Sequence, residues 1–112
     1  MKHIAAAALT DLIAAQRSGL PAMLLDVREA WEVEIGRIEV AGADHLGLPM
    51  GSIAQRFGEL DPAQPIVCIC HHGVRSAQVA AFLERQGFES VYNLTGGTDA
   101  WSTQVDARLT RY

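Results

Sequence analysis

Short apolar runs alternate with amphipathic stretches along the chain, which indicates strands and helices in turn. Continuous apolar residues bounded by turn residues predict strands at Met23–Val27 and Ile66–Ile69, the latter as a central strand. Apolar residues at three-to-four spacing predict one helix over Ala5–Arg17, ending before Gly19. A second helix is predicted over Ser76–Gln86, with Ser76 as N-cap and Gly87 as C-cap. Weaker patterns predict short strands at Asp44–Leu46 and Ser90–Tyr92, short helices at Glu29–Ile35, Ser52–Phe57 and Asp99–Gln104, and a turn at Gly96–Gly97.

Strands that alternate with helices are typical of an α/β fold with a parallel sheet. We expect a single domain over residues 1–112, with a central, mostly parallel β-sheet flanked by helices on both faces. A chain of 112 residues is in the usual size range of one domain. The sequence leaves open whether the last residues, 105–112, pack on the domain or form a loose tail.

The charge balance argues against polyanionic partners. The formal net charge is −4 and the pI is near 5.4, so neither nucleic acid nor an anionic membrane is an expected partner.

Thr10 and Asp11 interrupt the apolar stretch Ile4–Leu9, which therefore reads as the start of the folded domain rather than as a secretory signal. With no apolar run of about 18 residues to span a bilayer, we expect a soluble, cytoplasmic protein.

The chemistry points to Cys70, which directly follows the predicted strand Ile66–Ile69 and precedes a predicted helix. A free cysteine with a pKa of about 8.5 is only slightly ionised at neutral pH, and the thiolate is the nucleophile. A helix N-terminus, the positive charge of Arg75 and a loop bent at Gly73 all favour negative charge beside them. The segment therefore predicts an activated cysteine in a nest of backbone N–H groups that could also hold an anion.

The loop Cys70-His71-His72-Gly73-Val74-Arg75-Ser76 resembles the active-site loop of the rhodanese family of sulfurtransferases. Two further segments are similar to that family: Leu25-Asp26-Val27-Arg28-Glu29-Ala30-Trp31-Glu32, and Asn93-Leu94-Thr95-Gly96-Gly97 followed by Ala100-Trp101. Gly87-Phe88 before Val91-Tyr92 fits as well, so the resemblance runs from about Leu24 to Trp101.

The resemblance implies a rhodanese-like domain in which Cys70 accepts sulfane sulfur as a persulfide and passes it to an acceptor. Thiosulfate, a low-molecular-weight persulfide or a protein persulfide would be the donor, and a thiol or cyanide the acceptor. No cofactor and no metal are implied. The substrate-binding residues would come from the loop: His71, His72, Gly73, Val74, Arg75 and Ser76.

The roles of four loop and flanking residues are weighed separately. Arg75 would either bind the anionic end of the donor or form an ion pair with a carboxylate near the segment 26–29. His71 stands where many thiosulfate-active relatives have a basic residue, and it is mostly neutral above its ordinary pKa of about 6.5. It would either weaken the attraction for thiosulfate or be a solvent-facing histidine without catalytic weight. Asp26 and Arg28 are expected to support the neighbouring loop by an ion pair or turn hydrogen bond.

Several other residues are interpreted structurally. Cys68 is expected to be a small buried apolar residue on the same face as Cys70, with a resolving thiol as the alternative. Zinc ligation by the cysteines and histidines of residues 68–72 is disfavoured by their crowding. Trp31 and Trp101 are expected to pack, and Gly96–Gly97 to allow close approach to the Cys70 loop. The segment 36–49 is longer than in the family, and its role is open.

Two other functional classes stay open beside the sulfurtransferase. Only four residues separate Cys70 from Arg75, whereas cysteine phosphatases have five, which disfavours a phosphatase or an arsenate reductase. A non-catalytic rhodanese-fold module that binds or regulates a partner is the other alternative, although such a module does not need a nucleophile at this position.

Overall fold

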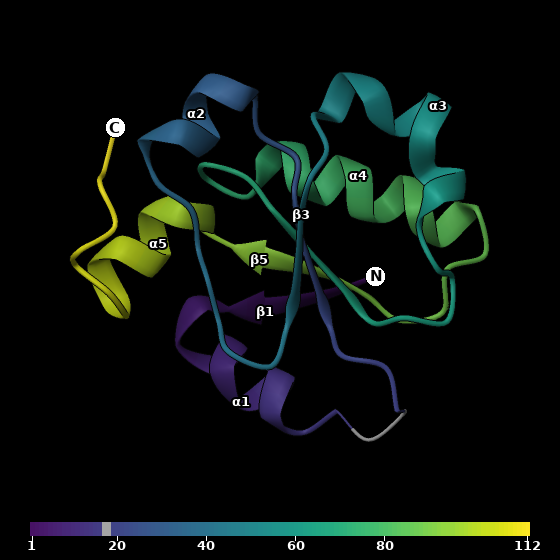
Figure 1. Cartoon of the computed structure of the whole chain (residues 1–112), viewed down its shortest axis with the longest axis horizontal. Helices are drawn as coiled ribbons and strands as arrows, with labels where there is room; N and C mark the ends of the chain where they lie inside the picture. Colours follow the sequence, from purple (N-terminus) through teal and green to yellow (C-terminus); the bar gives the residue numbers. More distant parts are fainter. Residues whose placement is uncertain (17–18) are drawn as a thin grey trace.

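The computed structural model describes residues 1–16 and 19–112, in which a five-stranded sheet is the central element (Figure 1). All neighbouring strands are parallel, and their order is β1-β5-β4-β2-β3. The strands are β1 Lys2–Ala5, β2 Met23–Asp26, β3 Asp44–Gly47, β4 Ile66–Ile69 and β5 Val91–Thr95. The helices are α1 Leu9–Ala14, α2 Ala30–Ile35, α3 Ile53–Arg56, α4 Val74–Arg85 and α5 Gly97–Gln104, with 3-10 turns η1 Ala6–Ala8, η2 Met50–Ser52 and η3 Phe57–Glu59. The predicted α/β fold with a parallel sheet is confirmed.

Each face of the sheet has its own apolar core, because successive side chains of a strand point to opposite faces. In the fully buried strand β4, Ile66 and Cys68 belong to the core under α3 and α4. Val67 and Ile69 belong to the opposite core, which contains residues of α1 and α5. Helices therefore cover both faces, as the alternating pattern predicts, and β4 is the central strand.

The N-terminal region differs from the prediction. Residues 2–5 form the edge strand β1, which pairs with β5, and the α-helix begins only at Leu9. The alanine-rich run favours a helix by local propensity, but pairing with β5 provides the backbone hydrogen bonds of residues 2–5 instead. Arg17, the last residue of the predicted helix, lies outside the described residues.

Helix α4 starts two residues earlier than predicted. Its N-cap is Gly73, and Ser76 lies inside the first turn rather than at the cap. At its other end, Gly87 has φ +95°, its N–H donates to Glu84, and the N–H of Phe88 donates to Leu83. This is the Schellman geometry that the Gly87-Phe88 pair favours.

The long connection 36–49 is partly built into the core. Ile38 and Val40 are buried in the core beside α1 and α5, and the N–H of Val40 donates to Nε2 of His45. Residues 36–49 therefore contribute apolar packing as well as loop length.

The two tryptophans differ. Trp101 is buried in the core beside α1 and α5, whereas Trp31 is 61% exposed and belongs to neither core.

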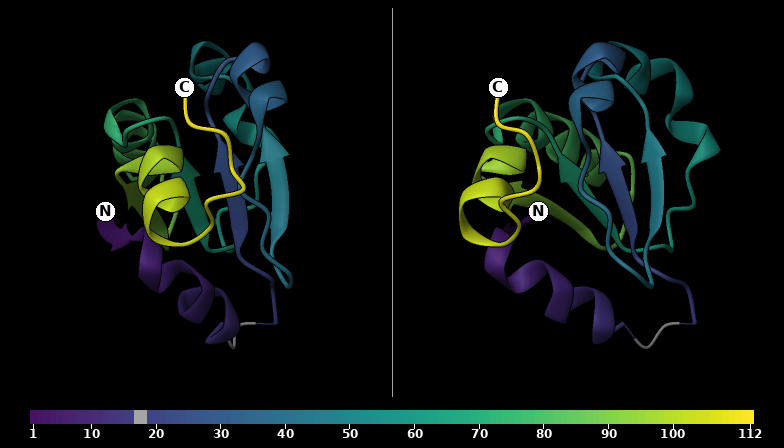
Figure 2. Two further views of the ribbon diagram at one scale, coloured as in Figure 1. Left: turned by 90° about the vertical axis from the view of Figure 1, so that its left-hand side faces the viewer. Right: turned by 60° about the vertical axis from the view of Figure 1, so that its left-hand side comes forward.

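The carboxyl ends of the strands meet at one end of the molecule, where α2 and the last residues of the chain also lie (Figure 2). Asp26 of β2 is in register with Ile69 of β4, and the N–H of Val27 continues the ladder to the carbonyl of Ile69. The segments after β2 and β4 consequently lie side by side. Among the described residues, no helix is long and apolar enough to cross a membrane.

Candidate functional site

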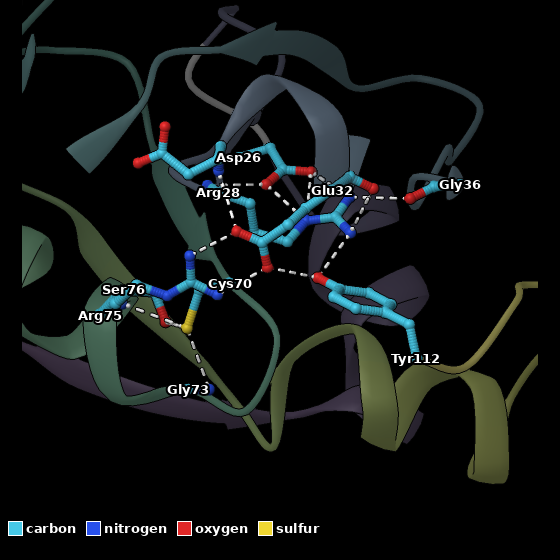
Figure 3. A network of polar contacts seen from close by, with 10 residues as sticks. Asp26, Arg28, Glu32, Gly36, Cys70, Gly73, Arg75, Ser76 and Tyr112 are labelled. Atoms are coloured by element: carbon cyan, nitrogen blue, oxygen red, sulfur yellow. Dashed lines mark hydrogen bonds and ion pairs between the residues drawn. The ribbon is translucent and has the colours of Figure 1, made fainter. Parts of the chain in front are cut away.

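The Cys70 loop is a tight turn between β4 and α4 that directs backbone N–H groups at the sulfur. The N–H of Gly73 lies 3.1 Å from Cys70 Sγ, and the N–H of Ser76 lies 3.4 Å from it (Figure 3). The Ser76 hydroxyl lies 3.3 Å from the same sulfur. Gly73 has φ +97°, and a Cβ there would lie 3.0 Å from the Gly96 nitrogen, so the turn requires glycine. The arrangement is an anion-holding nest at the N-terminus of a 12-residue helix.

This nest acts on the ionisation of Cys70. Burial is the largest single influence on its pKa and raises it, because a charged sulfur is disfavoured away from water. Hydrogen bonds from the Ser76 hydroxyl and from the N–H groups of Ser76, Gly73 and His72 stabilise the thiolate, and together they hold the pKa below its ordinary value. The site therefore stabilises the thiolate relative to that of an ordinary cysteine, even though Cys70 is only 1% exposed.

The N-terminus of α5 holds the outer side of this loop. The N–H of Thr98 donates to the Cys70 carbonyl at 2.9 Å, and the N–H of Asp99 donates to the His71 carbonyl at 3.1 Å. A Cβ on Gly97 would lie 2.2 Å from the Cys70 carbonyl oxygen and 2.5 Å from that of His71. The predicted close approach of Gly96–Gly97 to the Cys70 loop is confirmed.

Arg75 forms a two-pronged ion pair with Glu32 of α2. Its two terminal nitrogens lie 2.6 Å and 2.8 Å from the two carboxylate oxygens (Figure 3). Glu32 is 3% exposed, and it also accepts the N–H of Glu29 in a capping box at the start of α2. The hydrogen bond from Arg75 is the main reason why the pKa of Glu32 is lowered to about 2. The charge of Arg75 is thus matched by a carboxylate, and the ion pair ties α4 to α2.

Arg28 is buried behind this pair, with 1% of its surface exposed. Its Nε and one terminal nitrogen bind the Asp26 carboxylate, the closest contact being 2.7 Å. The remaining N–H groups reach the carbonyls of Gly36 and Glu32 and the Tyr112 hydroxyl. All five donors of the guanidinium therefore have acceptors, which a buried arginine requires. Asp26 and Arg28 fix the path of the chain from β2 into α2.

The last residues of the chain bring Tyr112 against the Cys70 loop. Its hydroxyl donates to Glu32 at 2.7 Å, and its ring stacks on His71 at 3.8 Å between centroids. His72 stacks on the other side of His71 at 3.9 Å, and Trp31 meets the Tyr112 ring edge-on. Burial, followed by the neighbouring His72, lowers the pKa of His71. His71 is therefore neutral at neutral pH.

The predicted site residues do not all lie at the sulfur. Gly73 and Ser76 contact Sγ, and the backbone N–H of His72 also bonds to it, although the His72 residue is exposed. Val74 is 67% exposed. The structure adds three residues that the sequence did not single out as functional: Glu32, Asn93 and Tyr112. The first two stood within recognisable segments, but only the fold shows which atoms they contact.

Cys68 lies on the same face as Cys70 and is fully buried, as predicted. Burial raises its pKa to about 12, so it stays a thiol at physiological pH. Within the ranges 1–16 and 19–112, no group of three or more His, Cys, Asp or Glu residues is arranged to hold a metal ion.

Comparison with known proteins agrees with this geometry. The rhodanese-like domain model matches residues 6–104. The chain is 31% identical over 110 residues to "Thiosulfate sulfurtransferase GlpE" of Pseudoalteromonas translucida, covering 98% of this chain and 97% of the relative. It is 39% identical over 94 residues to "Rhodanese-like/PpiC domain-containing protein 12, chloroplastic" of Arabidopsis thaliana, covering 81% of this chain but 30% of that longer protein.

Among solved structures, the rhodanese-like domain protein of Staphylococcus aureus superimposes with a TM-score of 0.78 at 28% identity. The superposition covers 100% of this chain and 99% of that one. Fold and sequence similarity therefore agree, and the chain belongs to the rhodanese-like domain family.

Proposed function

We propose that this protein is a sulfurtransferase that carries sulfane sulfur as a persulfide on Cys70. The observation that supports this most directly is a nearly buried sulfur that accepts hydrogen bonds from the loop N–H groups of Gly73 and Ser76. A nucleophile so enclosed is reached most easily by a single protruding atom, such as the terminal sulfur of thiosulfate or of a persulfide. A bulky tetrahedral phosphoryl group fits such an opening poorly.

The reaction has two steps. The Cys70 thiolate attacks the outer sulfur of the donor, a new S–S bond forms, and the donor's bond to that sulfur breaks. With thiosulfate the leaving group is sulfite, and with a persulfide it is a thiolate; each takes the bonding electron pair. An acceptor thiolate or cyanide then attacks the outer sulfur, and Cys70 leaves as a thiolate again. The loop N–H groups stabilise the negative sulfur before and after transfer, without any cofactor.

The charges around the loop favour a donor with little negative charge. Arg75 is paired with Glu32 and Arg28 with Asp26, so the positive charge of each guanidinium is largely offset by a neighbouring carboxylate. His71 is neutral because its pKa is lowered. The backbone N–H groups remain as the main anion-stabilising element, and they suit one charged sulfur atom better than a dianion. We therefore propose a low-molecular-weight or protein persulfide as the preferred donor and thiosulfate as a weaker one.

The test is turnover with each donor. Thiocyanate release from cyanide would be followed with two donors: thiosulfate, and cysteamine persulfide, whose ammonium group offsets its one negative charge. We expect turnover above the uncatalysed rate with both, a higher kcat/KM for the persulfide, and no turnover above the uncatalysed rate with Cys70→Ser. Cys68→Ser is the matched control and should retain turnover. Loss of activity in Cys68→Ser but not in Cys70→Ser would contradict the assignment. Absence of turnover with every donor would instead indicate a binding module.

A further inference from the structure

The Ser76 hydroxyl lies between two groups, either of which can accept the one hydrogen bond that it donates. Ser76 is fully buried, and its Oγ lies 3.3 Å from Cys70 Sγ and 2.5 Å from Asn93 Oδ1. A hydroxyl donates one hydrogen bond and can accept another. While Cys70 is a thiol, the chain is complete: the S–H donates to Ser76, and the Ser76 O–H donates to Asn93.

Asn93 is held so that its oxygen faces Ser76. Its amide nitrogen donates to the Gly73 carbonyl at 3.2 Å and lies 3.3 Å from Nδ1 of His3. The side chain is almost entirely buried. Across residues 1–16 and 19–112, Ser76 is the one side chain that donates to Oδ1. If the Ser76 hydroxyl turned away, a buried amide oxygen would lose its donor, which costs free energy.

When Cys70 ionises, the Ser76 hydroxyl can donate its hydrogen bond either to the sulfur or to Asn93. The thiol proton leaves to solvent, and the thiolate becomes a stronger acceptor than an amide oxygen. We propose that Asn93 is a positioning residue that competes with the Cys70 thiolate for the Ser76 proton and so limits how readily Cys70 ionises. This proposal rests on the proposed role of Cys70 as the nucleophile.

The same competition distinguishes the free enzyme from the sulfur-loaded one. In the persulfide, the inner sulfur carries neither a proton nor the charge, which is on the outer sulfur. The uncharged inner sulfur is a weak hydrogen-bond acceptor, so the Ser76 hydroxyl donates to Asn93 again. Asn93 thus destabilises the free thiolate but not the persulfide, and this difference favours the sulfur-loaded state.

Other titratable groups lie around the Cys70 loop, and the test must separate their effects from those of Ser76 and Asn93. Cys68 on β4 and Arg75 on α4 interact electrostatically with Cys70 itself. Further charged or titratable groups surround the loop: His71 and His72 within it, Glu32 on α2, Asp26 and Arg28 after β2, Asp99 on α5, and His3 on β1 beside Asn93. His3 loses its contact with Asn93 in Asn93→Leu, but it does so with and without Ser76, so this effect and the fields of the unchanged groups cancel in the cycle.

The experiment is a double-mutant cycle read by the ultraviolet absorbance of the thiolate during pH titration, with Cys70→Ser as the blank. Loss of a hydrogen bond to a charged group should lower the thiolate-to-thiol ratio about tenfold in Ser76→Ala. Asn93→Leu should raise that ratio about threefold, because Ser76 is then free to donate to sulfur. In the Ser76→Ala background, Asn93→Leu should give no rise.

An equal effect of Asn93→Leu in both backgrounds, or a fall in the ratio with Ser76 present, would overturn the proposal. If Asn93→Leu does not fold, Asn93→Asp provides a second cycle, because a carboxylate competes more strongly for the Ser76 proton. It should lower the ratio more with Ser76 present than with Ser76→Ala, and equal decreases would again overturn the proposal. The titration needs no sulfur donor, so its outcome is separate from that of the sulfur-transfer test.

Discussion

Gly97 allows the most direct test of how the Cys70 loop is supported. It has φ +57°, and a Cβ at this position would lie 2.2 Å from the Cys70 carbonyl oxygen and 2.6 Å from the His71 carbonyl carbon. Both contacts are with backbone atoms, which cannot turn aside as a flexible side chain could. Gly97→Ala must therefore move α5 away from the loop or distort the loop itself.

Gly87 provides the matched control. It also has a positive φ, +95°, but nothing lies within 4 Å of a Cβ built on it. Gly87→Ala therefore measures the cost of the left-handed backbone alone, about 1 kcal/mol in free energy of unfolding. The stabilising effect of alanine on the unfolded chain is the same at both positions and cancels in the comparison.

The additional cost of Gly97→Ala comes from the clash and from hydrogen bonds that the displacement breaks. Overpacking costs about 1–3 kcal/mol. The bonds from Thr98 and Asp99 to the loop carbonyls contribute about 1 kcal/mol each. We expect Gly97→Ala to lower the free energy of unfolding by about 3–5 kcal/mol more than Gly87→Ala does. Urea denaturation measures both variants.

The loop displacement should also slow the reaction of Cys70. Gly97→Ala should reduce the rate of Cys70 alkylation by iodoacetamide by about tenfold or more, since one lost hydrogen bond to the thiolate suffices for that. Gly87→Ala should react like the unmodified chain. Equal stability losses in the two variants, with unchanged alkylation in both, would refute the view that Gly97 is required for contact with the loop.

Three further predictions concern the charged groups. Arg28→Met should lower the free energy of unfolding by about 3–5 kcal/mol, because it leaves the Asp26 carboxylate buried without its partner. The control Arg56→Met removes an exposed ion pair and should leave the urea midpoint unchanged. The folded-state pKa of Glu32 is lowered from 4.5 to about 2, so its ionised form stabilises the protein above pH 4.5, and this stabilisation is lost as the pH falls toward 2. Glu32→Gln should therefore remove that part of the acid sensitivity of the urea midpoint. His71→Lys should raise kcat/KM for thiosulfate about fivefold, through roughly 1 kcal/mol of added attraction. A similar gain with cysteamine persulfide, whose ammonium group offsets its one negative charge, would contradict the charge argument.

Local pattern was sufficient for the part of the chain that forms the Cys70 loop. The apolar run Ile66–Ile69 and the long amphipathic helix after it predicted the strand–loop–helix unit, because a buried central strand and a covering helix have strong periodicities. Gly73 predicted the positive φ of the turn. The exact helix start was missed, since Gly73 rather than Ser76 is the cap.

The parts that were missed depend on contacts between distant segments. β1 is a strand only because β5 is beside it, and nothing in Lys2–Ala5 indicates that pairing. Tyr112 lies 80 residues from Glu32 in the sequence, so its hydrogen bond could not be predicted from spacing. Arg28 is buried although charged residues are normally exposed, and only the surrounding acceptors explain this.

If Cys70 carries transferable sulfur, the intact mass of the reduced protein should increase by one sulfur atom after incubation with a persulfide donor or with thiosulfate. Cyanide should remove this sulfur, and Cys70→Ser should not acquire it. Retention of the added sulfur in Cys70→Ser, or no addition with either donor, would contradict this role of Cys70.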